Sequence, residues 1–395
     1  MDASKTPVIL SGCRTPIGSF GGSLASFPAP KLGAIVIKEA LQRAKLAPTD
    51  VDEVIMGNVL TAGEGQAPAR QAALFADLPD SVPCMTINKV CGSGLKATML
   101  AAQAIQCGDS SIIVAGGMES MSNAPYLLEK ARTGYRMGNG ALVDSMIKDG
   151  LWDVYNDFHM GSAAELCSRE CNIPREAQDE FAITSYKRAQ HATQEGKFKE
   201  EIVPVIITGK KGDTTVFDAD EDVFKTNFEK IPALKPSFEK NGTVTAANSS
   251  SINDGAAALV IASAGRAQEL GAKPLAKIIA YTSTAKRPEL FTTAPVDAIG
   301  KVLAKASMAK EDIDLFEINE AFAVVTLAAN KMLGLPIEKV NVNGGAVAMG
   351  HPIGASGARI LVTLIHALKQ RNLKRGLAAI CIGGGEASAM IIETL

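Results

Sequence analysis

Short apolar runs of strand length alternate with longer Ala- and Leu-rich stretches along most of the 395-residue chain. Examples of the apolar runs lie at 54–56, 112–114, 315–318 and 378–382. Runs without polar alternation are typical of strands buried on both faces, whereas the Ala- and Leu-rich stretches have helical length and composition. The alternation therefore predicts an α/β fold in which helices cover both faces of a sheet.

The same pattern occurs twice in the chain. Residues 41–52 and 303–314, offset by 262 positions (303 minus 41), share Leu, Ala and Asp at matching places. Two further matches have nearly the same offset: Ser93-Gly94 with Ser356-Gly357, and Gly116-Gly117 with Gly383-Gly384. A nearly constant offset at three separated places indicates a duplicated fold.

The duplication divides the chain into two halves and an insertion. We expect an N-terminal half at 1–120, completed by about 249–271, and a C-terminal half at 272–395. Residues 121–248 have no counterpart in the second copy and include a polar, hairpin-like stretch around 209–222. We interpret them as an inserted lobe over the core, since insertions of this size usually carry substrate-binding loops.

The composition and charge of the chain argue against nucleic-acid and membrane partners. A net charge of −2 gives no electrostatic reason to expect binding to nucleic acid or to an acidic membrane surface, and no apolar stretch approaches the ~20 residues of a membrane-spanning helix. The N-terminal residues resemble neither a secretion signal nor a mitochondrial leader. Seven cysteines, an odd number, favour free thiols in a reducing compartment. We therefore expect a cytoplasmic protein that binds small molecules.

Cys167 and Cys171 stand four positions apart, which is about one helical turn. This spacing suits a metal ion, but no Cys or His pair stands nearby in the sequence, so a buried helical pair is the favoured interpretation. A thiol-redox protein is a further alternative, although the chain has no Cys-x-x-Cys motif.

Cys91 stands in a turn that favours reactivity. Residues 88–94 read Asn-Lys-Val-Cys-Gly-Ser-Gly, and the apolar positions after them recur at helical spacing. We expect Cys91 beside a helix N-terminus, where unpaired amides and the helix dipole lower the pKa of a thiol. Gly92 and Gly94 leave room for a ligand at the sulfur.

His351 lies in a run, 341–357, that contains five glycines. Such a run brings the backbone close to a ligand and presents one side chain that transfers protons at neutral pH. In the duplication, Ser356-Gly357 of this run corresponds to Ser93-Gly94, the pair that follows Cys91. We therefore expect the two turns to face one cleft.

Two more motifs follow apolar runs. Cys381 ends such a run and precedes a stretch of three glycines that begins at Gly383, whose exposed amides suit an oxyanion. Asn319 and Glu320 directly follow the run at 315–318, where polar groups are costly unless they are used or solvated. Two cysteines and a histidine on related glycine-rich turns indicate a catalytic site rather than packing alone.

These motifs resemble those of the thiolase family over nearly the whole chain. The similar segments, in family order, are the nucleophile motif at 88–94, the Asn-Glu-Ala-Phe motif at 319–322, the histidine motif at 350–352 and the second-cysteine motif at 381–385. The resemblance implies a duplicated fold of α-β-α-β-α layers with an inserted loop domain. It also implies an acyltransferase that joins two acetyl-CoA molecules into acetoacetyl-CoA and CoA, or the reverse, as a homotetramer without a required metal or redox cofactor.

The resemblance gives each motif a role. His351 would deprotonate Cys91, which then holds the acetyl group as a thioester. Cys381 would take a proton from the methyl carbon of a second acetyl-CoA, while His351 and a water positioned by Asn319 stabilise the enolate. The amides of Cys91 and Gly383 would stabilise the oxyanion of the acyl-enzyme.

The resemblance also bears on the substrate. Phe158-His159-Met160-Gly161 is similar to the biosynthetic short-chain thiolases, in which the methionine closes the acyl pocket and the histidine lies near the pantetheine of CoA. The other CoA contacts that it implies are Leu151, Phe238, Ala246, Ser250, Ala321 and Phe322. Packing alone would account for Leu151 and Phe238 equally well.

The segments 86–91 and 387–390 are similar to the mitochondrial acetoacetyl-CoA thiolases, which bind a potassium ion. The positions that match its ligands are Tyr186, Ala246, Ala247, Ser249 and Val347. A buried tyrosine hydroxyl among backbone carbonyls could equally bind water. Glu386 departs from the family pattern, and we expect it to face solvent or to pair with a basic residue.

Three other functions compete with this assignment. A ketoacyl synthase shares the fold and the Claisen chemistry but needs a histidine or asparagine in place of Cys381. A non-catalytic acyl-CoA or lipid carrier would be expected to have lost Cys91, His351 or Cys381. A 3-ketoacyl-CoA thiolase that accepts a broader range of chain lengths would keep Cys91, His351 and Cys381. Only activity on longer substrates distinguishes it from a short-chain thiolase.

Overall fold

The computed structural model describes residues 2–209 and 211–395. Its main sheet has ten strands, nine of them in the order β4-β3-β5-β12-β1-β13-β16-β15-β14. The N-terminal half contributes β1 (Pro7–Arg14), β2 (Gly18–Ser19), α1 (Ala29–Ala44), β3 (Glu53–Gly57), α2 (Pro68–Phe75), β4 (Cys84–Ile87), α3 (Ser93–Cys107), β5 (Ile112–Ser120), β12 (Asn253–Ser263) and α6 (Ala264–Glu269). The C-terminal half contributes β13 (Ala276–Ala285), α7 (Ala294–Ala306), β14 (Leu315–Ile318), α8 (Ala323–Leu333), α9 (Ala346–Met349), α10 (Ile353–Gln370), β15 (Arg375–Ile382) and β16 (Glu386–Thr394).

Strand pairing repeats between the two halves. β3 runs parallel to β5, which pairs antiparallel with β12, and β12 pairs antiparallel with β1. In the same way β14 runs parallel to β15, which pairs antiparallel with β16, and β16 pairs antiparallel with β13. The halves join through two residue pairs, Val8 with Lys277 and Ile9 with Ala276. The predicted duplication is therefore confirmed.

Loop details repeat as well. The Asp52 carboxylate accepts hydrogen bonds from the amides of Ser111 and Ile112, at 2.7 and 2.8 Å. Its counterpart Asp314 accepts them from Lys374 and Arg375, at 2.9 and 2.8 Å. Each carboxylate ties the start of a central strand to the strand beside it.

One of the three predicted matches between the halves was wrong. Gly116 lies inside β5 opposite Met56, and the equivalent pair in the second half is Ala379 opposite Ile318. Gly383 lies instead in the turn after β15. The glycine pairs therefore agree by coincidence. Gly116 packs against the backbone of β12 and Gly117 against Gly354 of α10, whereas the glycines after β15 form a turn.

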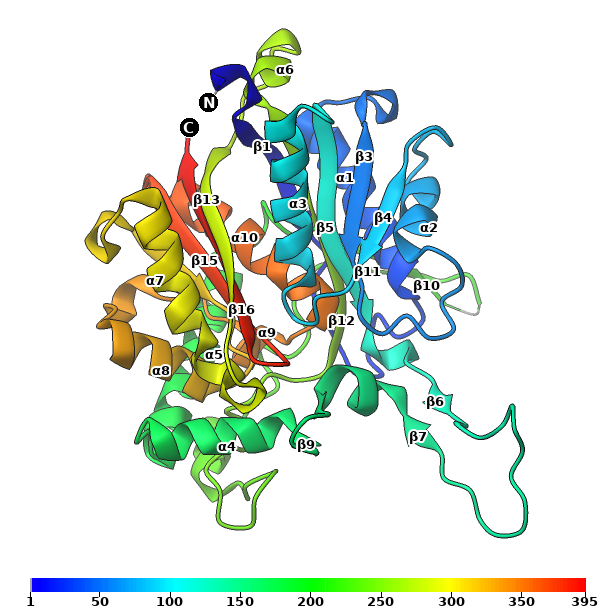
Figure 1. Cartoon of the computed structure of the whole chain (residues 1–395), viewed down its shortest axis with the longest axis vertical. Coiled ribbons are helices and arrows are strands. Elements are labelled where there is room, and N and C mark those ends of the chain that lie inside the picture. Colours follow the sequence, from blue (N-terminus) through cyan, green and yellow to red (C-terminus); the bar gives the residue numbers. More distant parts are fainter. Residues whose placement is uncertain (1, 210) are drawn as a thin grey trace.

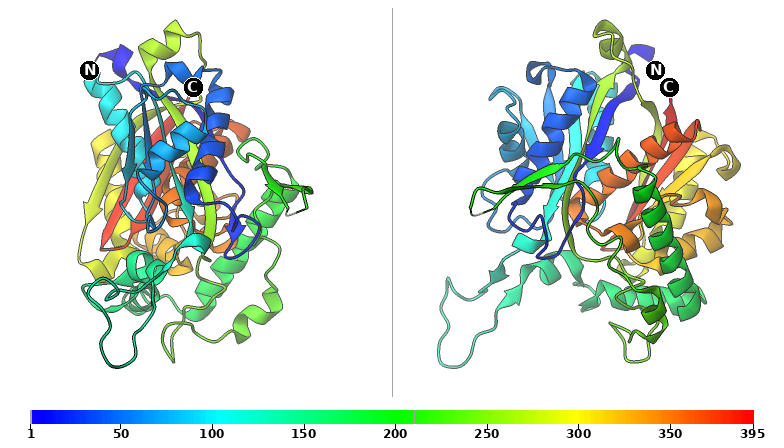
Figure 2. Two further views of the ribbon diagram at one scale, coloured as in Figure 1. Left: turned by 90° about the vertical axis from the view of Figure 1, so that its right-hand side faces the viewer. Right: turned by 180° about the vertical axis from the view of Figure 1, so that it is seen from behind.

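The helices α3 and α10 form a central layer between the two arms of the sheet (Figures 1 and 2). Side chains of α1 and α2 form one core with the N-terminal strands. Side chains of α3 and α10 form the middle core, and those of α7 form a third core with the C-terminal strands. This arrangement confirms the predicted α-β-α-β-α order of layers.

The two central helices meet at glycines. A Cβ on Gly94 would lie 2.7 Å from the amide nitrogen of Ala358, and a Cβ on Gly357 would lie 2.4 Å from that of Leu95. The contacts are reciprocal, as expected for two copies of one fold. Because both helices begin near this crossing, the turns that precede them are brought together.

The first part of the insertion between β5 and β12 lies across one end of these layers (teal to green in Figure 1), and its later part continues along the back of the molecule (Figure 2). Its elements are β6 (Tyr126–Leu127), β7 (Val143–Asp144), β8 (Trp152–Asp153), β9 (Phe158–His159), α4 (Met160–Glu170), α5 (Arg175–Gln194), β10 (Val205–Thr208) and β11 (Thr214–Phe217). The last two strands form a hairpin, as predicted, although it begins a few residues earlier. The domain boundaries at 120, 248 and 271 stay a prediction. Within the described residues, no helix combines the length and apolar character that crossing a membrane requires.

Candidate active site

The turn between β4 and α3 holds Cys91 in an unusual backbone conformation. Val90 has a φ of +45°, a left-handed conformation that a β-branched residue rarely adopts. The Ser93 hydroxyl accepts a hydrogen bond from the Lys89 amide at 2.8 Å and donates to the Val90 carbonyl at 2.7 Å. The Asn88 side chain accepts from the Val90 amide at 2.9 Å. These bonds sustain a strain of about 1–3 kcal/mol next to the predicted nucleophile.

The sulfur of Cys91 lies against the glycine turn of the other half. Burial raises the pKa of the Cys91 thiol to about 11, although the amides of Gly383 and of Cys91 itself donate toward the sulfur. The expectation of a lowered pKa was therefore wrong, because the cost of desolvating a thiolate here exceeds the effect of the helix end. Cys91 thus needs a base to become a nucleophile.

His351 is oriented by the turn before α10. Its Nδ1 lies 2.5 Å from the Ser356 hydroxyl, which donates to the Pro352 carbonyl at 2.9 Å. Since the hydroxyl proton is used there, Nδ1 must carry the ring proton and donate to Ser356, which leaves Nε2 with a free electron pair. Burial, followed by the charge of Arg359, lowers the pKa of His351 to about 3. The imidazole is therefore neutral and able to accept a proton at Nε2.

Cys381 lies near the end of β15 and is fully buried. It belongs to the same core cluster as Met160 and Phe322. Burial raises the pKa of its thiol well above the usual value, and the charge of a Cys91 thiolate raises it further. The amide of Gly383, two positions after Cys381, points toward the Cys91 sulfur, so both cysteines belong to the surroundings of one turn.

The glycine turn after β15 needs glycine for two reasons. Gly384 and Gly385 have φ near +89° and +88°, and a Cβ on Gly385 would lie 2.4 Å from the Lys286 carbonyl oxygen. After the turn, Glu386 forms an ion pair with Lys89. The prediction that Glu386 pairs with a basic residue is therefore confirmed, and the pair links this turn to the one that carries Cys91.

Asn319 follows β14 and is fully buried. Its Oδ1 accepts a hydrogen bond from the Arg359 guanidinium at 3.4 Å, while its Nδ2 has no partner among the described residues. Arg359 is buried as well and pairs with Glu317 at 3.0 Å. This contact orients the Asn319 amide so that its NH₂ group points away from Arg359 and stays free to donate.

Sequence reasoning missed Ser356 and Arg359 as parts of the site. Every residue from 353 to 368 is buried, so α10 is enclosed by protein on all sides. An arginine inside such an apolar helix is rare unless it is paired, and that signal could have identified Arg359. Ser356 gave no comparable signal, because its contact with His351 depends on the turn conformation.

One cavity of about 570 Å³ reaches Cys91, His351 and Gly383. All eight residues predicted to contact CoA line it: Leu151, His159, Met160, Phe238, Ala246, Ser250, Ala321 and Phe322. Cys381 and Asn319 are not part of the lining. The cavity is also lined by residues that sequence reasoning missed, among them Phe291, Met121 and Asp222.

Aromatic side chains form much of the cavity wall. The His159 ring stacks on Phe238 with centroids 4.8 Å apart, and Phe322 packs edge-on against both Phe238 and Phe291 at 6.1 and 6.5 Å. A Cβ on Gly161 would lie 2.3 Å from the Phe238 ring, so glycine is needed behind it. The volume and the mainly apolar lining suit a slender organic ligand.

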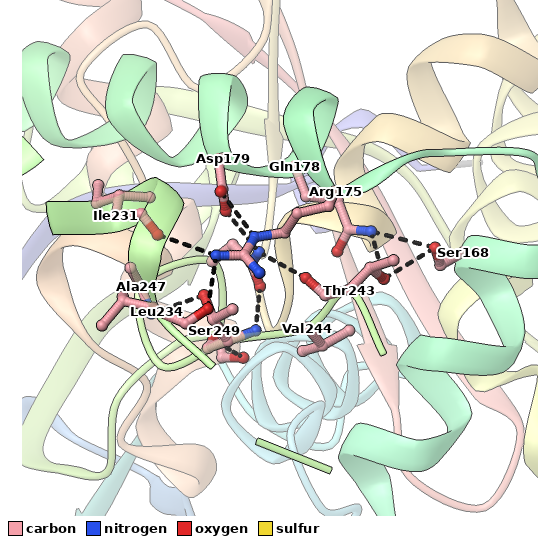
Figure 3. A network of polar contacts seen from close by, with 12 residues as sticks. Ser168, Arg175, Gln178, Asp179, Ile231, Leu234, Thr243, Val244, Ala247 and Ser249 are labelled. Atoms are coloured by element: carbon pink, nitrogen blue, oxygen red, sulfur yellow. Dashed lines mark hydrogen bonds and ion pairs between the residues drawn. The ribbon is translucent and has the colours of Figure 1, made fainter. Parts of the chain in front are cut away.

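A polar network fixes segment 243–249, which forms part of this wall (Figure 3). Arg175 donates to Asp179 at 2.7 Å and to the carbonyl of Leu234 at 3.0 Å. Asp179 in turn accepts from the Asn248 side chain at 2.9 Å. The insertion helix α5 thereby sets the conformation of the segment that contacts the cavity.

The residues predicted to bind potassium lie along this segment and in the core beside it. Tyr186 and Val347 pack in one buried cluster. Ala247 and Ser249 are buried, whereas Ala246 is exposed to the cavity. Hydroxyl and carbonyl oxygens are neutral donors of the kind that bind an alkali cation. Their joint binding of potassium stays a prediction.

Two family models match the chain: "Thiolase, N-terminal domain" over residues 7–265 and "Thiolase, C-terminal domain" over residues 272–394. The acetyl-CoA acetyltransferase of Cupriavidus necator is 57% identical over 98% of both chains. The mitochondrial acetyl-CoA acetyltransferase of Bos taurus is 54% identical over 98% of this chain and 91% of its own.

Solved structures agree with these matches. A Bacillus anthracis acetyl-CoA acetyltransferase has a TM-score of 0.97 at 43% identity over the full length of both chains. A thiolase from Ascaris suum, solved in complex with coenzyme A, has a TM-score of 0.94 at 48% identity over 99% of this chain and 100% of its own. Both halves are matched in order around a cavity with the expected side chains, and the chain belongs to the thiolase family of acyltransferases.

Proposed function

We propose that the protein catalyses the reversible Claisen condensation of two acetyl-CoA molecules to acetoacetyl-CoA and CoA, by a ping-pong mechanism through acetyl-Cys91. The observation that carries the proposal is that Cys91, with two amides at its sulfur, and a neutral His351 reach one cavity. Relatives at 50–57% identity are named acetyl-CoA acetyltransferase, which supports acetyl-CoA as the substrate.

In the first half-reaction, Nε2 of His351 takes the thiol proton of Cys91. The sulfur attacks the carbonyl carbon of acetyl-CoA, and CoA leaves with the proton from His351. The amides of Cys91 and Gly383 donate to the carbonyl oxygen as it becomes negative, and each such donor contributes about 3–4 kcal/mol. Because thiol and imidazole are both neutral before substrate binds, proton transfer accompanies the attack.

In the second half-reaction, the thiolate form of Cys381 removes a proton from the methyl carbon of a second acetyl-CoA. The raised pKa of Cys381 suits this step, since a thiolate with a high pKa is a strong base toward a weakly acidic carbon. His351 and a water held by the free NH₂ group of Asn319 stabilise the enolate oxygen. The enolate carbon then attacks the carbonyl carbon of the acetyl thioester, and the bond to Cys91 breaks. The Cys91 thiolate takes the proton from Cys381, so that Cys91 is again a thiol and Cys381 a thiolate for the next cycle.

We propose a short-chain substrate range because Met160 and Phe322 line the cavity and share one buried cluster with Cys381, where they would limit the length of the acyl group. The test compares thiolysis of acetoacetyl-CoA with that of longer 3-ketoacyl-CoAs, with Cys91→Ser as the inactive control. We expect a preference of at least about tenfold in kcat/KM for the short substrate. Comparable rates on long chains would favour the broader degradative thiolase.

A potassium ion bound by Tyr186, Ala246, Ala247, Ser249 and Val347 is part of the proposal. It would stabilise segment 243–249 and thereby the wall that contacts CoA. Activity and CoA affinity are to be measured in matched potassium and sodium buffers. Equal rates and equal affinity in both would remove the ion from the proposal.

A homotetramer is proposed as the working assembly. The loop between β6 and β7 projects from the molecule (Figure 1). It exposes apolar side chains, with Leu142 at 64% and Met137 fully accessible. Exposed apolar residues on a projecting loop are typical of an interaction surface. Light scattering is expected to give four times the chain mass of 41.3 kDa, and a monomer at micromolar concentration would contradict this.

A cytoplasmic location completes the proposal. The free state of all seven cysteines suits a reducing compartment. One relative is named mitochondrial, so fractionation of cells that express the full gene product is the deciding measurement. Recovery with a mitochondrial marker would replace the proposed location.

A further inference from the structure

A second pair of thiols lies outside the groups that the reaction uses. The Sγ atoms of Cys167 and Cys171 are 3.9 Å apart. Cys167 lies in the last turn of α4, and Cys171 caps the C-terminus of that helix. We propose that this pair is a site of reversible oxidation, at which a hydroperoxide converts the two thiols into a disulfide within one helical turn.

One thiol of the pair is accessible to an oxidant and the other is buried, as a site of reversible oxidation requires. Cys171 is partly exposed, so a small oxidant can reach it, whereas Cys167 is 2% exposed and is shielded by the core. Residues four apart in a helix have Cα atoms about 6 Å apart, inside the range that a disulfide spans. The helix ends here, because Asn172 has a φ of +49°. Side-chain rotation at this end can bring the sulfurs to bonding distance.

Local charges make Cys171 the attacking thiol. A hydrogen bond from Cys167 lowers the pKa of Cys171 to about 7, and the positive charges of Lys331 and Lys286 act in the same direction, against burial and Glu170. Lys331 also donates to the Cys171 carbonyl at 2.8 Å, which keeps its ammonium group nearby. The same hydrogen bond raises the pKa of Cys167. Cys167 therefore stays a thiol until Cys171 has been oxidised to the sulfenic acid. A low-pKa, accessible thiol beside a resolving partner is typical of redox-sensitive sites.

The chemistry balances with the peroxide as the only co-reactant. The Cys171 thiolate attacks one peroxide oxygen, so that an S–O bond forms, the O–O bond breaks and hydroxide leaves. Cys167 then attacks the sulfenic sulfur, forming the S–S bond and releasing the second oxygen as water. In sum, two thiols and one hydrogen peroxide give one disulfide and two waters, and an added dithiol reverses the oxidation.

The pair is connected to the cavity through α4. This helix begins at Met160, which lines the cavity, and Cys167 packs in the same core cluster as Met160 and Phe322. The oxidation state of the pair therefore alters the packing behind the acyl end of the cavity. The proposal rests on the geometry of the two thiols and does not require the proposed function.

The test follows the thiols and not turnover. The purified protein is treated with hydrogen peroxide at pH 7, samples are quenched with iodoacetamide, and peptides are mapped by mass. We expect a peptide with Cys167 joined to Cys171, formed roughly threefold to tenfold faster than the exposed Cys107 loses its thiol. Dithiothreitol is expected to restore both alkylation sites. Cys107 is the matched control within the same chain.

Two variants sharpen the test. In Cys167→Ser, Cys171 should still react but should proceed to sulfenic and higher oxides without a disulfide. In Cys171→Ser, the buried Cys167 should stay reduced over the same period. Thiolysis activity before oxidation shows that each variant is folded. A Cys171 that reacts no faster than Cys107, or that is oxidised without joining Cys167, would overturn the proposal.

Discussion

The first turns of α3 and α10 carry a serine at equivalent positions but serve two different chemistries. The Ser93 hydroxyl donates to the Val90 carbonyl, three residues earlier, and the Ser356 hydroxyl donates to the Pro352 carbonyl, four residues earlier. The oxygen of Ser93 also accepts a backbone amide, whereas the oxygen of Ser356 accepts the ring proton of His351. The duplication therefore supplies the position of both serines. Ser93 bonds only the backbone of its own turn, whereas Ser356 bonds its backbone and also orients a reacting side chain.

Burial shifts the pKa values of the two reacting side chains, Cys91 and His351, in opposite directions. It raises the pKa of Cys91 and lowers the pKa of His351, because in each case the charged form is disfavoured. Both reacting groups are therefore neutral before substrate binds. The following experiments test this comparison.

The largest effect is expected from replacing the nucleophile. Cys91→Ser should lower kcat at least about 1,000-fold and abolish transfer of labelled acetyl from acetyl-CoA to the protein. Cys381→Ser should lower turnover by a similar factor but leave the labelling of Cys91 intact. Labelling and steady-state rates are measured on the same preparations. Loss of labelling in Cys381→Ser would mean that the two cysteines do not divide the half-reactions as proposed.

A smaller and more selective effect is expected from the paired serines. Ser356→Ala should slow acylation roughly 10- to 100-fold, because His351 loses the acceptor that fixes its tautomer. Ser93→Ala should instead lower the free energy of unfolding by about 1–3 kcal/mol, because the Lys89 amide loses its partner. Single-turnover acylation and urea unfolding separate the outcomes. Equal effects on rate and stability in both variants would remove the distinction between the turns.

His351 also predicts how stability depends on pH. Its pKa is about 3 in the folded protein and about 6.5 in an unfolded chain. The unfolded state therefore binds the proton first, and the contribution of His351 to stability is lost as pH falls from about 6.5 toward 3, by up to about 1.4 kcal/mol per pH unit. His351→Asn should remove this slope. The measurement is the difference in unfolding free energy between parent and variant across pH, and a flat difference would contradict the neutral imidazole.

The smallest effect is expected from the ion pair between Lys89 and Glu386. Both side chains are partly exposed, at 23% and 36%, so the pair should contribute no more than about 1 kcal/mol. Glu386→Gln and Lys89→Met should each change kcat/KM only a few-fold, and the double variant should be no worse than either single one. The rates are compared at low and high salt. A loss above tenfold in Glu386→Gln alone would place Glu386 in the chemistry.

The sequence was informative wherever a feature depends on local pattern. The duplication could be predicted because matching residues recur at a nearly constant offset along the chain. The cavity wall could be predicted because its residues belong to motifs that resemble a known family. The pKa of Cys91 could not, since it depends on atoms that pack on the turn from the other half. The contact between Ser356 and His351 depends on backbone geometry that no spacing reveals, whereas Arg359 could have been identified as an arginine inside an apolar helix.

The crossing of α3 and α10 at Gly94 and Gly357 has a consequence for how the molecule can change. Main-chain atoms in contact at these glycines set the distance between the two reactive turns. This contact acts as a spacer of fixed length, because it is made by backbone atoms and not by flexible side chains. Neither copy can then gain a methyl group at its glycine without displacing the reactive turn of the other. After the ancestral duplication, the two copies could diverge in their turns but not in the spacer that separates them.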